Sequence, residues 1–95
     1  MKYNTLKPEF FHFIPEELEE GILYISLEYS AVLHKCCCGC GSVVSTPISN
    51  GREGWDGGWT LTNENGLVSL HPSIGNFQIP CKTHYFIKNN EVIWC

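Results

Sequence analysis

The cysteines of this chain are concentrated in one short segment. Four of the six cysteines lie within five positions, in the segment 34–41, which reads HKCCCGCG. Cysteine thiolates and histidine nitrogens are the usual ligands of zinc, and the two glycines permit the tight turn that brings neighbouring ligands to one ion. The residue types and their spacing therefore predict a metal site.

A structural zinc site needs four ligands in tetrahedral arrangement, usually from two separate parts of the chain. Alternate residues of an extended segment project to the same side, so Cys37 would point away from a metal held by its neighbours. A later cysteine, Cys81, supplies the distant ligand. Spacing alone leaves open a set that uses Cys37 or His34 instead. The predicted ligands are Cys36, Cys38, Cys40 and Cys81.

Four thiolates would fill the coordination shell and leave no position for a metal-activated water, so we expect a structural Zn²⁺. Disulfides are a poor alternative, because the clustered cysteines have only Cys81 and Cys95 as distant partners. Residues 1–20 lack the pattern of a secretory signal. We therefore expect a cytoplasmic protein with reduced thiols.

A second group of residues could perform acyl chemistry. Ser73 precedes an Ile-Gly-Asn turn, and His84 follows Cys81 by three positions. A serine nucleophile needs a neighbouring base, which His84 could provide, and an oxyanion needs donors, which Asn76 and the backbone near Gly75 could provide. The structural alternative is a turn serine and a half-buried strand histidine.

The sequence does not identify an acidic third member for this group. Asp56 and Glu64 are available carboxylates, but no spacing favours either. We expect the clustered thiols to serve the metal rather than to act as nucleophiles.

The elements that must position these residues are short strands. Segments rich in β-branched and aromatic residues alternate with Asn, Gly and Pro turns, which predicts six to eight short strands, with hairpin turns at residues 63–66 and at Asn89-Asn90. The pattern of residues 15–20 predicts one helical turn. The pattern of residues 1–15 predicts a strand or an extended arm. We expect a small all-β or β-rich domain, residues 1–95, whose thin core one structural zinc reinforces. The expected strands lie at 21–26, 31–34, 43–48, 59–62, 67–70, 84–88 and 91–94.

The charge distribution argues against two classes of partner. The net charge is −4, and the six Lys and Arg residues are scattered, so we expect no nucleic-acid binding. No apolar run approaches the roughly 18 residues of a membrane span, so we expect no membrane association.

Several short motifs together resemble a known family. They are PEEL at 15–18, GILYIS at 21–26, HKCCCGCG at 34–41, SLHPSIGN at 69–76 and PCKTHYFI at 80–87. The chain is similar over nearly its whole length after residue 14 to small bacterial Cys/His-rich proteins encoded in operons with ubiquitin-like proteins and their activating and conjugating enzymes. The family has proline between its first two cysteines, where this chain has Cys37.

The resemblance implies a function. It places Cys36, Cys38, Cys40 and Cys81 on zinc positions and Ser73 and His84 on the polar motifs. It implies a zinc-stabilised, deubiquitinase-like serine peptidase, a hydrolase that processes or removes a ubiquitin-like modifier in anti-phage defence. The alternative is a non-catalytic zinc-binding adaptor that binds the modifier or its conjugating enzymes through aromatics such as Trp55. A third hypothesis, a metallohydrolase, makes His84 a metal ligand.

Overall fold

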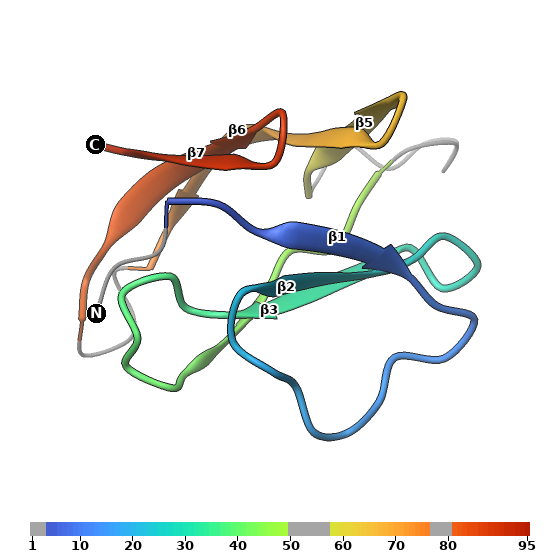
Figure 1. The fold of residues 1–95 in the computed structure, drawn as a ribbon, viewed down its shortest axis with the longest axis horizontal. Coiled ribbons are helices and arrows are strands. Elements are labelled where there is room, and N and C mark those ends of the chain that lie inside the picture. The colour runs from blue at the N-terminus through green and yellow to red at the C-terminus, as the bar shows by residue number, and fades with distance from the viewer. Residues whose placement is uncertain (1–3, 50–57, 77–80) are drawn as a thin grey trace.

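Eight short strands form two four-stranded sheets in the computed structural model, which describes residues 4–49, 58–76 and 81–95 (Figure 1). The described residues contain no helix, and hence none that could cross a bilayer. The predicted all-β class with hairpins is confirmed. The first sheet, in spatial order, consists of β1 (Lys7–Phe10), β2 (Ile22–Ser26), β3 (Ala31–Lys35) and β4 (Val43–Ser45). The second consists of β5 (Thr60–Glu64), β6 (Leu67–Gly75), β7 (His84–Lys88) and β8 (Glu91–Trp94).

The second sheet is built from the two predicted hairpins. Asn65 and Gly66 connect β5 to β6 with φ values of 54° and 86°, and Asn89 and Asn90 connect β7 to β8 with 50° and 67°. Two-residue hairpin loops of the favoured type require positive φ at both positions, which Asn and Gly adopt at least cost. Both turn predictions are therefore confirmed, and the turns fix the register of the pairs that follow.

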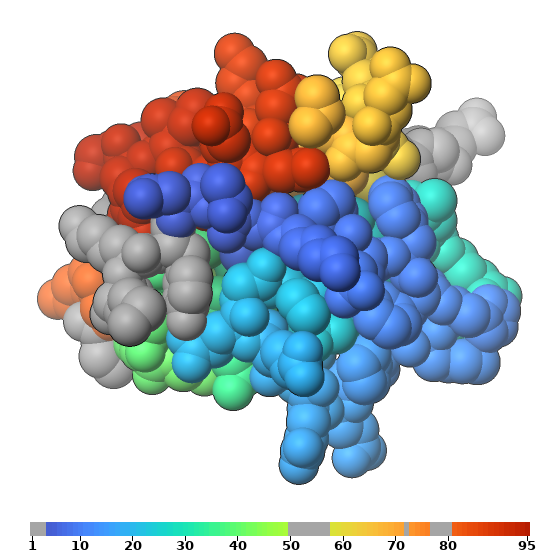
Figure 2. Space-filling model, in the orientation of Figure 1, coloured from blue at the N-terminus to red at the C-terminus, as the bar shows by residue number. Residues whose placement is uncertain are grey.

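The core lies between the two sheets. Both sheets contribute fully buried side chains, among them Leu23, Ile25, Val32, Val68, Ile74, Tyr85 and Ile87. In the space-filling view the C-terminal strands, coloured red, lie directly against the N-terminal segment, coloured blue (Figure 2).

The chain also joins the two sheets at their edges. Thr5 bridges to Glu91 of β8, and the chain then continues into β1, which pairs with β2 in parallel. At the opposite edges, Ile48 bridges to Trp59 just before β5. These contacts cover strand edges that would otherwise present unpaired backbone groups.

Two expectations about local structure were wrong. Residues 15–20 form bends instead of a helical turn, and the Glu19 N–H donates to the Tyr24 hydroxyl (2.7 Å) rather than to a helical carbonyl. The strand expected at 43–48 ends at Ser45. Pro47, which has no N–H to donate, limits its extension.

The side chain of Asn90 offers a test of how the two hairpins support each other. Its Oδ1 accepts from the Val68 N–H (2.7 Å), and its Nδ2 donates to the Gly66 carbonyl (3.0 Å). Asn90→Gly keeps the positive φ but removes both bonds, so we expect a loss of about 1–3 kcal/mol in the free energy of unfolding. Chemical denaturation measures this loss.

Asn89→Gly is the matched control, because Asn89 also has positive φ but an exposed side chain. We expect a change within about 0.5 kcal/mol. Equal effects of the two substitutions would contradict the role assigned to the Asn90 side chain.

Candidate functional site

An irregularity in β6 sets the position of Ser73. Leu70 pairs with Ile87 and Ile74 pairs with Tyr85, so the three β6 residues 71–73 lie opposite a single β7 residue, Phe86. The intervening bulge contains Pro72, which cannot donate a ladder hydrogen bond. Bulges redirect side chains and occur next to active sites. Ser73 therefore lies on a distorted stretch of a strand that is otherwise regularly paired.

Ser73 and His84 are in direct contact. The Ser73 Oγ lies 2.6 Å from the His84 Nε2, and both residues are half-buried. With the ring proton on Nδ1, Nε2 accepts the hydrogen bond from the serine hydroxyl. This is the geometry of a nucleophile with its general base. Gly75 lies opposite His84 in the register, so β6 places no side chain against the ring at that position.

Neighbouring groups hold this pair in place. The His84 ring stacks against Phe86, with centroids 6.4 Å apart and an angle of 28° between the planes. The Cys95 N–H donates to the His84 carbonyl (3.0 Å), and the Trp59 indole donates to the Ser73 carbonyl (3.4 Å). The Trp59 contact could not be predicted from the sequence, because it depends on the pairing of β5 with β6.

The four predicted metal ligands come together. The Sγ atoms of Cys36, Cys38, Cys40 and Cys81 all lie within 4.8 Å of one another. The Cys36 sulfur is 3.5 Å from each of the Cys38 and Cys81 sulfurs. Tetrahedral zinc with Zn–S bonds of about 2.3 Å separates its sulfurs by about 3.8 Å, so the cluster can hold a metal ion with little movement.

The turn between the first cysteines depends on the backbone. The Gly39 N–H donates to the Cys36 carbonyl (3.0 Å), and Gly39 has a φ of 87°. The Cys36 N–H donates to the Ser42 carbonyl (2.8 Å), which closes the loop behind the sulfurs. Glycine is favoured at such a φ because it has no Cβ.

Hydroxyl groups beside the cluster stabilise thiolates. A hydrogen bond from the Ser42 side chain lowers the pKa of Cys40 to about 6, and one from Thr83 lowers the pKa of Cys81. Burial, together with hydrogen bonds to neighbouring sulfurs, raises the pKa of Cys38 to about 12. Metal binding requires deprotonated cysteines, and both of these hydrogen bonds favour that form.

Cys37 and His34, the alternative ligands, lie outside the cluster. Cys37 is buried, and its burial raises the pKa of its thiol to about 11. His34 is fully buried, its Nε2 lies 2.7 Å from the Tyr85 hydroxyl, and burial lowers its pKa to about 4. Among the described residues, its Nδ1 has no hydrogen-bond partner. Both residues belong to the core.

Asn76 connects the cluster to the start of β7. Its backbone N–H donates to the Thr83 carbonyl (2.7 Å), and its Nδ2 donates to the Thr83 hydroxyl (3.1 Å) and points to the Cys36 sulfur (3.7 Å). To hold an oxyanion, the side chain would have to give up these contacts, and that role stays a prediction. Sequence reasoning missed Thr83, whose position two residues after Cys81 was the available signal.

The two carboxylates considered as third members lie elsewhere. Glu64 pairs with Leu67 at the hairpin end of β6, whereas Ser73 lies near the other end of the strand. Asp56 falls outside the described residues, as does Trp55.

Comparison with known proteins identifies the family. Neither the curated proteins nor the solved structures give a match. A family model described as bacterial ubiquitination-like system serine protease (BubE) matches residues 10–95, which include the thiol cluster, Ser73 and His84. The chain therefore belongs to the BubE family of bacterial ubiquitination-like system serine proteases.

Proposed function

We propose that this protein is a serine peptidase that matures or removes a bacterial ubiquitin-like protein by cleaving at the modifier's carboxyl terminus. The observation that supports the proposal most directly is the 2.6 Å contact between the Ser73 Oγ and the His84 Nε2. Membership in a family of serine proteases supports the choice of serine as nucleophile. A cytoplasmic location and a part in anti-phage defence belong to the same proposal.

The proposed reaction proceeds in two steps. His84 takes the hydroxyl proton as Ser73 attacks the carbonyl carbon, and it then returns the proton to the leaving amine as the C–N bond breaks. Water, activated by the same histidine, then hydrolyses the acyl-serine and releases the carboxylate. Backbone N–H groups near Gly75, or the Asn76 amide after a change of partners, would hold the oxyanion.

We assign a structural role to the metal, with Zn²⁺ as the proposed ion. Four thiolates would more than offset the charge of the ion and complete its coordination, so the contribution of the metal is to cross-link residues 36–40 with Cys81. His84 does not belong to the group of residues that could hold a metal, and its Nε2 faces Ser73. This arrangement favours the serine mechanism over a metallohydrolase.

A second function, as a non-catalytic adaptor, has one supporting observation. Phe13, Tyr29 and Leu27 are 67%, 55% and 60% exposed near the first sheet, and the rings of Phe13 and Tyr29 lie 5.5 Å apart. Exposed apolar groups of this kind mark sites of protein contact. An adaptor would bind the modifier or its conjugating enzymes without turnover, which the next experiment distinguishes.

Substitution of the proposed nucleophile tests the peptidase. Ser73→Ala should lower kcat/KM for cleavage of a ubiquitin-like protein fusion by about 10³-fold or more, since no other group would form the acyl intermediate. Cleavage is followed by mass spectrometry of the released fragments. Metal content and melting temperature should stay near those of the unsubstituted protein.

The control is Ser45→Ala, which removes an exposed hydroxyl from β4 in the other sheet. The Ser45→Ala variant should cleave the fusion at the rate of the unsubstituted protein. If Ser73→Ala cleaves as fast as this control, the peptidase assignment is wrong; binding of the fusion by all variants without turnover would favour the adaptor.

Substitution of single cysteines tests the ligand set. Cys81→Ser should lose the bound metal and melt at a lower temperature, because it removes the ligand that joins the two segments. Cys37→Ala should keep one metal ion per chain despite the loss of a buried side chain. Elemental analysis of the purified variants measures the metal. If Cys37→Ala loses the metal and Cys81→Ser keeps it, the assigned ligand set is wrong.

A further inference from the structure

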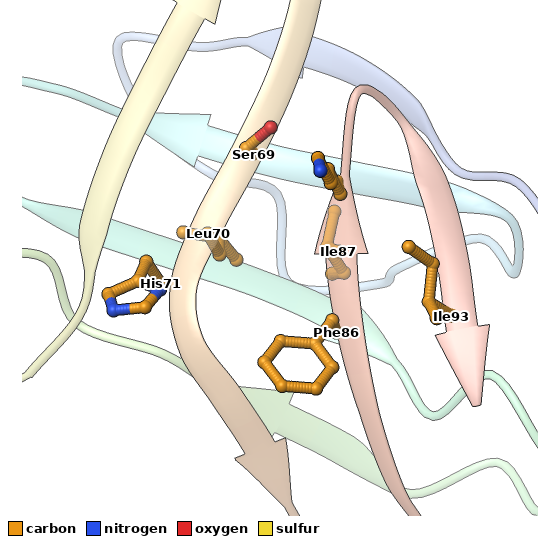
Figure 3. A pocket seen from close by; sticks show the side chains of 7 residues that line it. Ser69, Leu70, His71, Phe86, Ile87 and Ile93 are labelled. Carbon is orange, nitrogen blue, oxygen red and sulfur yellow. The ribbon is translucent and has the colours of Figure 1, made fainter. Parts of the chain in front are cut away.

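The outer face of the second sheet carries a groove beside the Ser73–His84 pair. Its volume is about 410 Å³, within the range of roughly 300–1,000 Å³ typical of ligand pockets. Figure 3 views it from close by, with Phe86 between β6 and β7 and Ile93 on β8. The lining residues are Ser69, Leu70, His71, Phe86, Ile87, Lys88 and Ile93.

The apolar part of the groove is an exposed cross-strand pair. Phe86 and Ile93 lie opposite each other in β7 and β8, and they are 38% and 45% exposed. Such a pair on the open face of a sheet leaves apolar surface in water that a bound side chain could cover. The rim carries donors from Ser69, His71 and Lys88. Among the residues that the structure describes, no acidic side chain lines the groove, although the whole chain has a net charge of −4.

Phe86 connects the groove to the proposed catalytic pair, because it lines the groove and stacks on His84. His84, Phe86 and Lys88 alternate along β7 and therefore share one face of the strand. The Phe86 ring lies 6.4 Å from the His84 ring. Two residues of an extended chain span about 6.6 Å, so a peptide whose carbonyl lies at Ser73 would place the side chain two residues away at Phe86.

We propose that this groove binds the extended carboxyl-terminal tail of the ubiquitin-like substrate, with an apolar side chain of the tail seated between Phe86 and Ile93. The proposal rests on the peptidase function above. A modifier can be attached to different targets, so the sequence on the target's side of the cleaved bond varies. Only the sequence on the modifier's side of that bond is the same in every substrate. The seated residue is the second one before the residue whose carbonyl is attacked, and rim donors bind main-chain carbonyls of the tail.

Steady-state kinetics with paired substitutions test the groove. Ile93→Ala should raise KM for the modifier fusion roughly tenfold, the effect of removing a few apolar atoms from a binding pocket. Alanine replaces in turn each of the last four residues of the tail. With the unsubstituted enzyme, the largest increase in KM is expected when alanine replaces the second residue before the attacked one. With the Ile93→Ala enzyme, the same tail substitution should hardly change KM, because the tail substitution and Ile93→Ala remove the same contact.

Two controls separate binding from folding. Val43→Ala shortens a 54% exposed side chain on β4, in the other sheet, and should leave KM unchanged. Labelling of Ser73 by a small fluorophosphonate reports the reactivity of the serine without filling the groove, and Ile93→Ala should be labelled at the normal rate.

The outcomes distinguish the two proposals. If Ser73 is labelled and the fusion is cleaved, but Ile93→Ala leaves KM unchanged or its effect does not couple to any tail position, the groove assignment is wrong. It is also wrong if Ile93→Ala slows labelling as much as it slows cleavage. If Ser73→Ala still cleaves the fusion, the peptidase proposal itself fails, whatever the groove variants do.

Discussion

The Thr83 hydroxyl joins the thiol cluster to the strand that carries His84. It lies 3.4 Å from the sulfurs of both Cys36 and Cys81 and accepts a hydrogen bond from the Asn76 amide. His84 is the next residue along the chain. A chain of this length buries a thin core, so apolar packing alone fixes the end of a strand weakly. Sulfur, hydroxyl and amide groups together hold the start of β7, and hence the base, in one place.

The bulge in β6 lets Ser73 depart from the regular alternation of the strand. A regularly paired strand would alternate strictly between core and surface, but a nucleophile must reach a base on the neighbouring strand. Two extra positions between Leu70 and Ile74 let Ser73 contact His84, while Leu70 and Ile74 both remain in the core. The irregularity is therefore confined to the place where the chemistry is proposed, and the hydrophobic pattern on either side is preserved.

Polar residues on the two sides of the second sheet have different environments. On the core side, His34 is held neutral by burial and contacts Tyr85, whose own pKa burial raises. On the outer side, His84 is half-buried beside an open groove. A histidine that must exchange protons with a substrate needs access to it, which only the second environment provides. The thiol cluster is joined to the start of β7 through the Thr83 hydroxyl.

The sequence by itself determined the elements and their chemistry. Asn-Gly and Asn-Asn specified two hairpins because few residues adopt consecutive positive φ values. The alternation of Cys36, Cys38 and Cys40 favoured three sulfurs on one side, because side chains alternate along an extended chain, and Cys81 supplied the distant ligand. These are local properties, which short segments express without reference to the rest of the fold.

Only the tertiary structure decided how these segments meet. The parallel pairing of β1 with β2, the contact of Trp59 with Ser73 and the orientation of Asn76 toward Cys36 depend on residues far apart in the sequence. The distance between Ser73 and His84 depends in turn on the register of β6 against β7 across a bulge. Register is set by the sum of many weak contacts between strands, and no single segment of the chain contains that sum.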